Sequence, residues 1–208
     1  MASESAPFPA GFNISTSRLH IVPFDPANQT HAEFLVQLWN TEDFINSCGR
    51  TSISTPEKAS NFIRQRVLQQ YSVNQYGMFL VSLKEGENVT LSPIGTVSLM
   101  KGAPPDPHFL APDIGFAVLP KHSGKGYAAE AAKGLLEWAH TDCGVEGAFG
   151  FCDPSNRRSR KVLQNIGMEF KGTAELQVFG GKKSAVYALP EMGDDLAVYG
   201  LAEPLSPE

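Results

Sequence analysis

The stretch Asp113-Ile-Gly-Phe-Ala-Val-Leu-Pro-Lys-His-Ser-Gly-Lys-Gly-Tyr-Ala-Ala-Glu-Ala-Ala132 carries the strongest structural signal in this chain. Its first seven residues are mostly apolar and predict a strand, after which a glycine-containing turn follows. The alanine-rich segment that begins at Tyr127 predicts a helix that is closed by Gly144. A strand that leads through a glycine-rich turn into a helix is the unit from which the rest of the fold can be worked out.

The turn within this stretch has the composition of an anion-binding loop. Gly124 and Gly126 place no side chain between the backbone and a ligand, and Lys121 and Lys125 add positive charge. The start of the helix contributes unpaired N–H groups and the positive end of the helix dipole. The pattern predicts a seat for a phosphate or pyrophosphate. The alternative is a helix start that needs glycines to turn tightly.

Two general phosphate-binding motifs, the Walker A loop and the dinucleotide-binding fingerprint, do not match this turn fully. A Walker A loop requires a glycine five residues before Gly124 and Ser or Thr after Lys125, where this chain has Leu119 and Gly126. A dinucleotide-binding fingerprint matches the glycine spacing, but its strand should end closer to the first glycine. Its acidic residue should also end the next strand, whereas Glu146 begins it. A dinucleotide-dependent enzyme stays as the weaker alternative.

Length and composition describe a packed domain. The 208 residues include 42% hydrophobic and 19% charged side chains, a balance that supports a core of ordinary size. Seventeen Lys and Arg against 22 Asp and Glu give a net charge of −5, which argues against a general nucleic-acid partner. No apolar run is long enough to cross a membrane, and the first dozen residues lack the pattern of a signal peptide.

Cysteine and histidine usage bounds the chemistry further. The three cysteines are widely spaced and outside CxxC pairs, and the five histidines show no ligand spacing, so we expect neither a disulfide framework nor a metal site. These features predict a cytoplasmic protein, with the nucleus left open as a second location. A monomer or a homodimer is expected.

The remaining elements follow one continuous order. Alternation predicts a strand over 18–24, placed at a sheet edge because of Pro23, and helical spacing predicts helices over 27–40 and 55–71. Further strands are expected over 78–83, 94–100, 113–119, 145–152, 170–176 and 184–189, and further helices over 127–141 and 155–166. We therefore expect a single α/β (α+β) domain over 15–190 with a mixed sheet of about seven strands. A flexible tail over 1–14 and a C-terminal tail over 191–208 flank it.

Several spaced motifs together resemble the GNAT superfamily of N-acetyltransferases, and within it the RimJ/RimL-type branch. The loop Ser123-Gly-Lys-Gly-Tyr-Ala128 resembles the pyrophosphate motif of that superfamily, and the predicted order of elements is the same. The other matching motifs are Thr16-Ser-Arg-Leu-His-Ile-Val-Pro23, Asp113 to Pro120, Glu130-Ala131, Asn156-x-x-Ser159 and Leu163-x-x-x-Gly167-Met168. The likeness covers about residues 15–190.

The resemblance implies transfer of an acetyl group from acetyl-CoA directly to an amine, without a covalent enzyme intermediate or a metal. It also implies helices on both faces of the sheet and two splayed central strands that hold the cofactor. Main-chain groups near Ala117 and Val118 would pair with the pantetheine amides, and a backbone N–H there would stabilise the thioester oxygen. The implied cofactor-binding residues are Phe116, Ala117, Val118, His122, Ser123, Gly124, Lys125, Gly126, Tyr127, Ala128 and Asn156.

Two residues are candidates for proton transfer. At pH 7, deprotonation costs roughly 1.4 kcal/mol for an α-amine and roughly 4.6 kcal/mol for a lysine, so one carboxylate acting through water suffices for a weakly basic amine. Asp113 at the start of its strand is the candidate base, and a plain strand-edge charge is the alternative. The superfamily often has a tyrosine where this chain has Leu163, so the resemblance points to Ser159 as the group that assists the leaving thiolate. A helix-surface serine is the alternative for that residue.

The acceptor amine is the reactant that the sequence specifies least. By resemblance, Trp39 and Phe44 lie where this family builds the wall of the acceptor site, although core packing is an alternative role for Trp39. The branch includes enzymes for protein N-terminal α-amines and enzymes for small-molecule amines, and both classes stay open. The missing tyrosine also leaves open a non-catalytic acyl-CoA-binding or sensing module.

Overall fold

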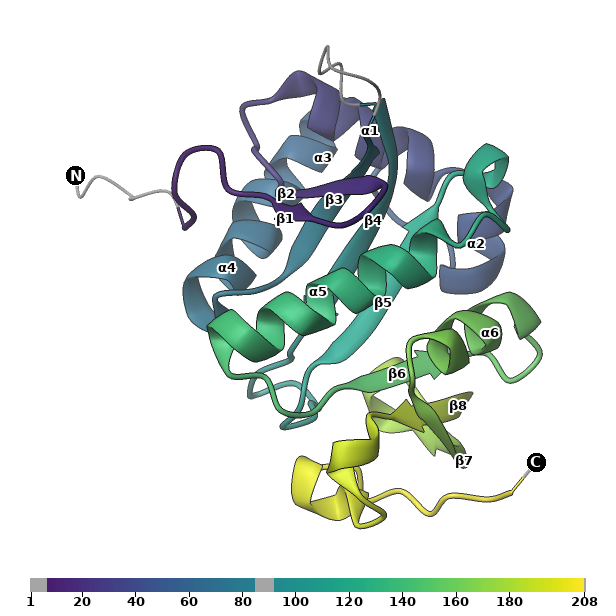
Figure 1. Cartoon of the computed structure of the whole chain (residues 1–208). Helices are drawn as coiled ribbons and strands as arrows, with labels where there is room; N and C mark the ends of the chain where they lie inside the picture. Colours follow the sequence, from purple (N-terminus) through teal and green to yellow (C-terminus); the bar gives the residue numbers. More distant parts are fainter. Residues whose placement is uncertain (1–6, 85–91, 208) are drawn as a thin grey trace.

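A computed structural model of the chain describes residues 7–84 and 92–207, within which eight strands form one mixed sheet (Figure 1). The strands lie in the order β1-β2-β3-β4-β5-β6-β8-β7. Neighbouring strands in this described part are antiparallel, apart from the parallel pair β5 and β6. The strands are β1 (Ile14–Ser15), β2 (Leu19–Pro23), β3 (Met78–Leu83), β4 (Ser92–Met100), β5 (Asp113–Val118), β6 (Phe149–Cys152), β7 (Glu169–Leu176) and β8 (Lys182–Ala188).

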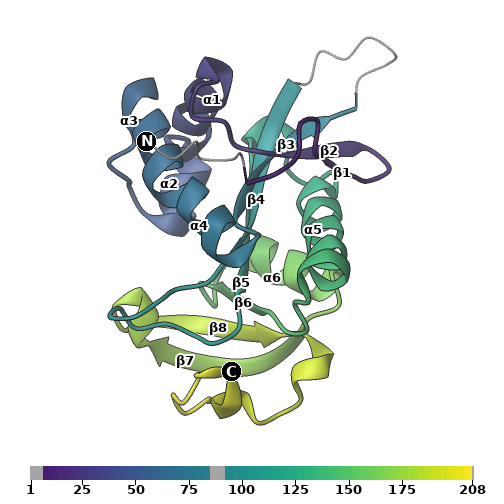
Figure 2. The ribbon, with the colours of Figure 1, turned by 90° about the vertical axis from the view of Figure 1, so that its left-hand side faces the viewer.

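Helices cover both faces of this sheet, as the resemblance implies. Helices α1 to α4 lie on one face, and α5 and α6 lie on the other (Figure 2). They are α1 (Gln29–Trp39), α2 (Glu42–Cys48), α3 (Pro56–Phe62), α4 (Leu68–Asn74), α5 (Tyr127–Cys143) and α6 (Arg157–Asn165), with a π-helical turn at Ile63–Val67 and 3-10 turns at Pro120–His122, Gln177–Phe179, Pro190–Met192 and Leu196–Tyr199. Among the described residues, no helix is both long and apolar enough to cross a membrane.

The helix predicted over 55–71 is confirmed, and its local chemistry explains it. Thr55 caps α3 by accepting a hydrogen bond from the Lys58 N–H, and Pro56 occupies the first turn. The π-helical turn joins α3 to α4 without a break. Ile63 and Tyr71 are buried along this run, so its apolar face supplies one side of the core.

The first and last described segments of the chain, residues 7–14 and 191–207, pack more closely than tails do. Phe8 and Phe12 stack on each other with ring centroids 4.6 Å apart, and Phe8 also contacts Tyr71 and Trp138. At the other end, a second apolar cluster includes Met192, Leu196 and Leu201 from beyond residue 190, together with Phe109 and Phe149. The structure therefore differs from the expected tails over 7–14 and 191–207, because these apolar side chains gain burial by covering the core.

The prediction that the strand around Pro23 lies at a sheet edge is wrong. β2 lies between β1 and β3, but β1 is short and pairs with His20 and Ile21, two to three residues before Pro23. On the other side Pro23 aligns with Phe79 of β3. The proline, which has no N–H, therefore stands at a part of β2 that β1 does not cover.

The parallel pair β5 and β6 parts almost as soon as it forms. In the part of the chain that the structure describes, these strands share one registered pair, Asp113 with Phe149, and the Phe149 N–H donates to the Pro112 carbonyl over 2.9 Å. Beyond this point each strand keeps its other neighbour, β4 for β5 and β8 for β6. The splayed central strands expected from the sequence are confirmed.

Candidate active site

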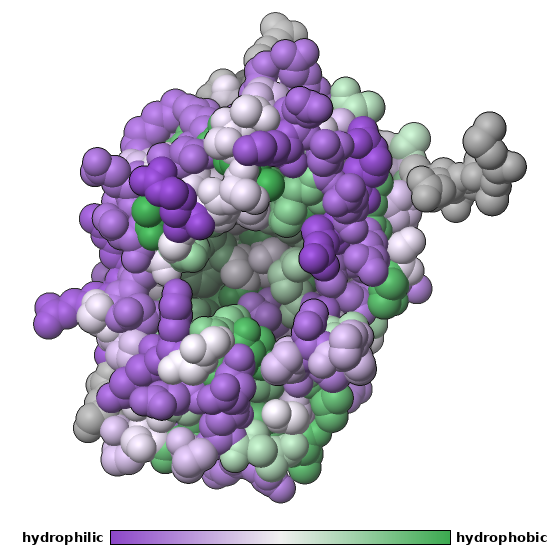
Figure 3. Space-filling view, turned by 180° about the vertical axis from the view of Figure 1, so that it is seen from behind, coloured by the Kyte–Doolittle hydropathy of each residue, from purple (hydrophilic) through white to green (hydrophobic). Residues whose placement is uncertain are grey.

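A cleft of about 690 Å³ opens where β5 and β6 part. Its walls come from these two strands, from α2, and from the residues at the starts of α5 and α6. The predicted site residues in its lining are Phe44, Phe116, Ala117, Val118, Ser123, Ala128, Asn156 and Ser159. The face of the molecule opposite α5 is hollowed near its middle, with apolar residues on the walls and hydrophilic residues around the rim (Figure 3). The structure thus brings most of the predicted residues to one cavity.

The glycine turn takes the backbone conformation that its sequence predicts. Gly124 and Gly126 have φ angles of +75° and +81°, in the left-handed region that favours glycine. Gly126 caps α5, and among the described side chains none donates or accepts a capping hydrogen bond there. The N–H groups of the first turn of α5 are therefore left for water or a ligand, next to the positive end of a helix of 17 residues.

Some predicted loop residues lie outside the cleft lining. Within residues 7–84 and 92–207, the cleft lining includes Ser123 and Ala128 but not His122, Gly124, Lys125, Gly126 or Tyr127. The rings of His122 and Tyr127 lie near each other, with centroids 6.3 Å apart. The prediction that these five residues contact the cofactor therefore stays a prediction.

The start of α6 places two predicted residues in the cleft. Asn156 caps the helix, because its side-chain oxygen accepts a hydrogen bond of 3.1 Å from the Ser159 N–H. The Asn156 amide nitrogen also donates to the Ser47 hydroxyl of α2 over 3.4 Å. Both Asn156 and Ser159 line the cleft. The cap thus fixes the turn that carries the Ser159 hydroxyl.

Asp113 lies at the closed end of the cleft, where β5 and β6 meet. It pairs with Met100 of β4 and Phe149 of β6, and its neighbours Ile114 and Gly115 line the cleft. Asp113 itself is outside the lining as far as the described residues show it. Burial raises the pKa of the Asp113 carboxyl to about 7, although a backbone hydrogen bond opposes the shift. This carboxyl therefore changes its protonation state near neutral pH.

Helix α2 forms a wall of the cleft that the sequence analysis missed. Phe44 lines the cleft, and Trp39 stacks behind it with ring centroids 5.3 Å apart and an interplanar angle of 16°. In the described structure Trp39 is outside the lining, so it supports Phe44 and packs against Phe62. Thr41 caps α2, and the acidic residues that follow it are the signal that predicts a helix start here.

A polar contact joins α2 to α6 across the cleft. Arg158 donates to the Asp43 carboxylate over 3.0 Å, and both residues also line the cleft. Their side chains are exposed, at 77% and 47% of their full accessible area. The pair therefore connects the two sides of the cleft without being buried itself.

Cys152 also lines the cleft, at the end of β6. Burial raises the pKa of the Cys152 thiol to about 11, although Arg160 opposes the shift. The thiol is therefore protonated at neutral pH, which disfavours a role as a nucleophile.

Comparisons with known proteins agree with this geometry. The chain matches the acetyltransferase (GNAT) domain family over residues 18–169. It is 27% identical over 158 residues to the FsC-acetyl coenzyme A-N(2)-transacetylase of Aspergillus fumigatus, covering 74% of this chain and 64% of that protein. It is 35% identical over 60 residues to the uncharacterized N-acetyltransferase YnaD of Bacillus subtilis, covering 29% of this chain and 35% of that protein. The matches therefore span about a third to just under two thirds of these relatives.

Solved structures with a similar fold belong to acetyltransferases. The ribosomal-protein-S5-alanine acetyltransferase of Vibrio fischeri superposes with a TM-score of 0.69 at 20% identity, over 89% of this chain and 98% of that one. The microcin C7 self-immunity acetyltransferase MccE, in complex with acetyl-CoA and AMP, gives a TM-score of 0.66 at 17% identity, over 88% and 97%. These likenesses support the fold. Because the family match extends over most of the chain and agrees with the cleft, this protein belongs to the GNAT family of acetyltransferases.

Proposed function

We propose that this protein transfers the acetyl group of acetyl-CoA directly to a primary amine, either a protein N-terminal α-amine or an amine of a small molecule. One observation carries the proposal. β5 and β6 part beyond the pair Asp113 and Phe149, and β5 runs on toward a glycine turn at the start of α5. A narrow gap in a sheet that leads to a helix N-terminus suits a long thiol arm that ends in a diphosphate.

The residues along this cleft fit acetyl-CoA by their chemistry. The apolar wall around Phe116 suits the pantetheine chain, and the unpaired backbone groups of the parted strands suit its amides. Gly124 has no heavy atom of the described residues within 4 Å of the point where a Cβ would lie, so a phosphate can approach its backbone closely. The remaining cofactor contacts proposed from the family resemblance, including those of His122, Lys125 and Tyr127, extend this seat.

In the proposed reaction one residue acts on the attacking amine and another acts on the departing thiolate. The amine nitrogen attacks the thioester carbon, and Asp113 takes up the amine proton through water. A backbone N–H near Ala117 stabilises the oxygen that gains negative charge. The carbon–sulfur bond then breaks, and the Ser159 hydroxyl donates a hydrogen bond to the departing thiolate of CoA. The products are the acetylated amine and CoA.

The acceptor enters, in this proposal, along the wall that α2 provides. Phe44 contacts it, and Trp39 holds Phe44 in place by stacking. The names of two similar proteins define the classes to test. One names FsC as the acetylated compound, and the other names the alanine of ribosomal protein S5. Because all three cysteines are free thiols, we propose the cytoplasm as the compartment.

The test has two steps. Isothermal titration with acetyl-CoA, CoA and NAD is expected to give binding of both CoA forms and none of NAD. Release of free thiol from acetyl-CoA is then followed with a panel of peptides carrying N-terminal Ala or Ser, a lysine-containing peptide and small primary amines. Amine-dependent thiol release supports the transferase. Binding without release across the panel would contradict it and favour a sensing module, and binding of NAD alone would favour a dinucleotide enzyme.

A further inference from the structure

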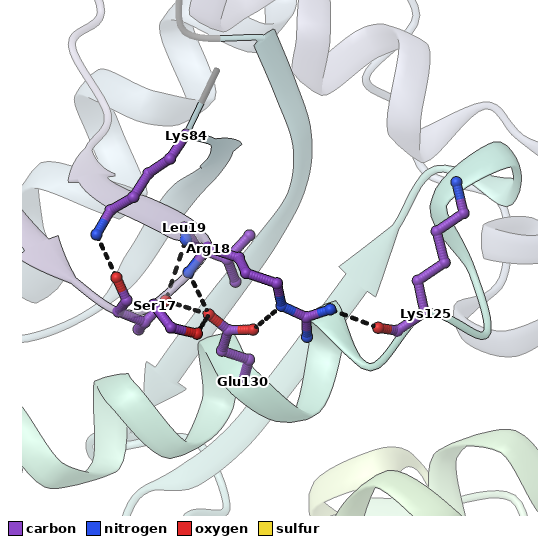
Figure 4. A network of polar contacts seen from close by, with 7 residues as sticks. Ser17, Arg18, Leu19, Lys84, Lys125 and Glu130 are labelled. Carbon is purple, nitrogen blue, oxygen red and sulfur yellow. Dashed lines mark hydrogen bonds and ion pairs between the residues drawn. The ribbon is translucent and has the colours of Figure 1, made fainter. Parts of the chain in front are cut away.

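Glu130 in the first turn of α5 is the centre of a network that ties the helix to the start of β2 (Figure 4). One carboxylate oxygen accepts hydrogen bonds from the Thr16 hydroxyl over 2.6 Å, the Ser17 hydroxyl over 3.0 Å and the Arg18 backbone N–H over 2.8 Å. The other accepts from the Arg18 Nε over 2.6 Å. Arg18 is therefore held to Glu130 by its main chain and by its side chain together.

The ionised form of Glu130 is strongly favoured in this network. Although burial opposes the shift, hydrogen bonds from Thr16, Arg18 and Ser17 lower the pKa of the Glu130 carboxyl to about 2. The Glu130 side chain keeps 15% of its accessible area, and the Arg18 side chain keeps 47%. Glu130 is therefore a carboxylate at every pH at which the enzyme would be assayed, and it fixes the direction in which Arg18 points.

From this position Arg18 reaches the glycine turn. Its Nη1 donates to the backbone carbonyl of Lys125 over 3.1 Å, and its guanidinium lies over the Tyr127 ring, 4.6 Å from the centroid. A Cβ added to Gly126 would lie 3.4 Å from the Arg18 Nη2. The guanidinium thus packs along the outer side of the loop, opposite to the cleft-lining residues Ser123 and Ala128.

The bond to the Lys125 carbonyl also orients the next N–H. In a trans peptide the carbonyl and the N–H of the same plane point in opposite directions. Because the Lys125 carbonyl faces Arg18, the N–H of Gly126 faces away from Arg18. Gly126 follows with φ +81°, which begins the first turn of α5. A rotation of this peptide would reverse both groups and would point a carbonyl oxygen at any anion in the loop.

We propose that Arg18 is a positioning residue for the diphosphate of acetyl-CoA, which it serves by holding the Lys125–Gly126 peptide so that the Gly126 N–H faces the ligand. This inference rests on the proposed function. Arg18 acts through the loop, and Glu130 acts through Arg18. The motif around Arg18 and the Glu130-Ala131 motif, which are far apart in the sequence, thereby have one common purpose.

The competing explanation is that Arg18 attracts the anionic ligand by its charge. Arg18→Ala removes both the charge and the bond, whereas Arg18→Lys keeps the charge but lacks the planar fork that bonds Glu130 and Lys125 together. Lys84→Ala is the matched control, because Lys84 is a nearby cation at the end of the neighbouring strand β3 and donates to the Thr16 carbonyl rather than to the loop. Thermal unfolding and circular dichroism of each variant establish that the proteins compared are folded.

The experiment measures affinity for two ligands by isothermal titration, CoA and pantetheine, of which the second lacks the diphosphate. We expect Arg18→Ala and Arg18→Lys to weaken CoA binding by about 10-fold or more and pantetheine binding by less than about 2-fold. Turnover with acetyl-CoA should show a KM raised by a similar factor and a kcat within about 2-fold of wild type. Lys84→Ala should leave both affinities unchanged.

Three results would overturn the inference. Full affinity of Arg18→Lys for CoA would mean that charge alone matters. Equal losses for CoA and pantetheine in a folded variant would mean that Arg18 supports the fold rather than the loop. Unchanged CoA affinity in both variants would mean that the peptide keeps its orientation without Arg18. If the wild type binds no CoA, the proposed function fails as well, and that outcome is distinct from the other three.

Discussion

The two halves of the sheet are built in different ways. From β2 to β5 each strand is antiparallel to the one before it in the chain, with five or six registered pairs between successive strands. From β6 to β7 the chain passes through α6, and β8 returns to lie between β6 and β7. In the described structure the two halves share one registered pair of strand residues, Asp113 with Phe149. Each half is paired strand to strand within itself, whereas a single registered pair joins it to the other half.

This difference shows where a binding site can arise without cost to the core. A gap inside either half would leave buried backbone groups unpaired. A gap at the boundary lets each strand keep a partner on its outer side, while the groups that face the gap can pair with a ligand. Four substitutions test this comparison, one on each half, one at the junction and one across the open side of the cleft.

The largest effect is expected at Gly126, on the first half. Gly126→Val should weaken acetyl-CoA binding about 100-fold or more, because φ +81° strains any residue with a Cβ and because the new side chain would press on the Arg18 guanidinium, which lies 3.4 Å from the Cβ position and holds the loop. The measurement is the dissociation constant by isothermal titration. Wild-type affinity in the folded variant would remove the loop from the site.

Gly144→Val is the matched control, since Gly144 lies at the other end of the same helix. It has φ +67°, and among the described residues nothing lies within 4 Å of its would-be Cβ. We expect a similar loss of stability and unchanged acetyl-CoA affinity. If both variants lose affinity equally, strain in α5 rather than a displaced glycine loop explains the result.

The next largest effect is expected at Ser159, on the second half. Ser159→Ala should lower kcat by about 10- to 100-fold with little change in acetyl-CoA affinity, because the departing thiolate loses its hydrogen-bond donor after binding. Ser155→Ala is a suitable control, because Ser155 precedes the same helix and bonds to Asp153. Equal kcat values for wild type and Ser159→Ala would show that the thiolate leaves unassisted.

Asp113, at the junction, should change the pH dependence. With a pKa of about 7, its carboxylate form grows as pH rises through neutrality, so kcat/KM of the wild type should rise over the same range. Asp113→Asn should cost about 10-fold between pH 7 and 8 for an α-amine, and less above that range, where the amine is already neutral. A loss that is equal at every pH would make the carboxyl structural.

The same raised pKa affects stability with a definite sign. Because burial favours the protonated carboxyl in the folded state, the stabilisation is present below about pH 4 and is lost as pH rises through about 7. We expect the melting temperature of the wild type to fall between pH 5 and pH 8 by more than that of Asp113→Asn. Identical differences in the two proteins would show that Asp113 is solvated like an ordinary carboxylate.

The smallest effect is expected at the contact across the cleft. Arg158→Ala breaks the pair with Asp43, whose side chains are 77% and 47% exposed, and pairs of this kind contribute about 1 kcal/mol or less. Melting temperature and acetyl-CoA affinity should therefore change little, within about 3-fold for the affinity. A large loss of stability would mean that α2 and α6 hold the halves together rather than the sheet.

The sequence predicted most of the first half because its signals are local. Thr55 followed by proline marks a helix start, and the β-rich runs that form β3 and β4 are close to each other in the chain. The sequence did not predict two features, helix α2 and the position of β8. Among the described side chains of α2 none is buried, so the helix has no apolar face to detect. The insertion of β8 between β6 and β7 depends on long-range packing that no local pattern encodes.

For the site, residues that act through their backbone were the easier ones to predict. The left-handed backbone of Gly124 and Gly126 was predictable because few other residues adopt that conformation, whereas Asn156, which caps α6 through its side chain, was expected from the family resemblance. The partnership of Glu130 with Arg18 was not, since 112 positions separate the two residues. Both residues belong to recognisable motifs, but the sequence does not show which motifs lie close together in the folded protein.

The packing of the C-terminal segment has a consequence for any attempt to trim this protein. The recognisable family match ends at residue 169, where β7 begins, yet β6 takes its outer neighbour from β8 and the Phe149 ring lies in a cluster with Met192 and Leu196. The segment that matches the family is therefore shorter than the unit that folds. A deletion at the family boundary would remove β8 and the apolar cluster that pack against β6, which forms one wall of the cleft. Loss of activity in such a truncated protein would therefore say nothing about the chemistry of the residues that it retains.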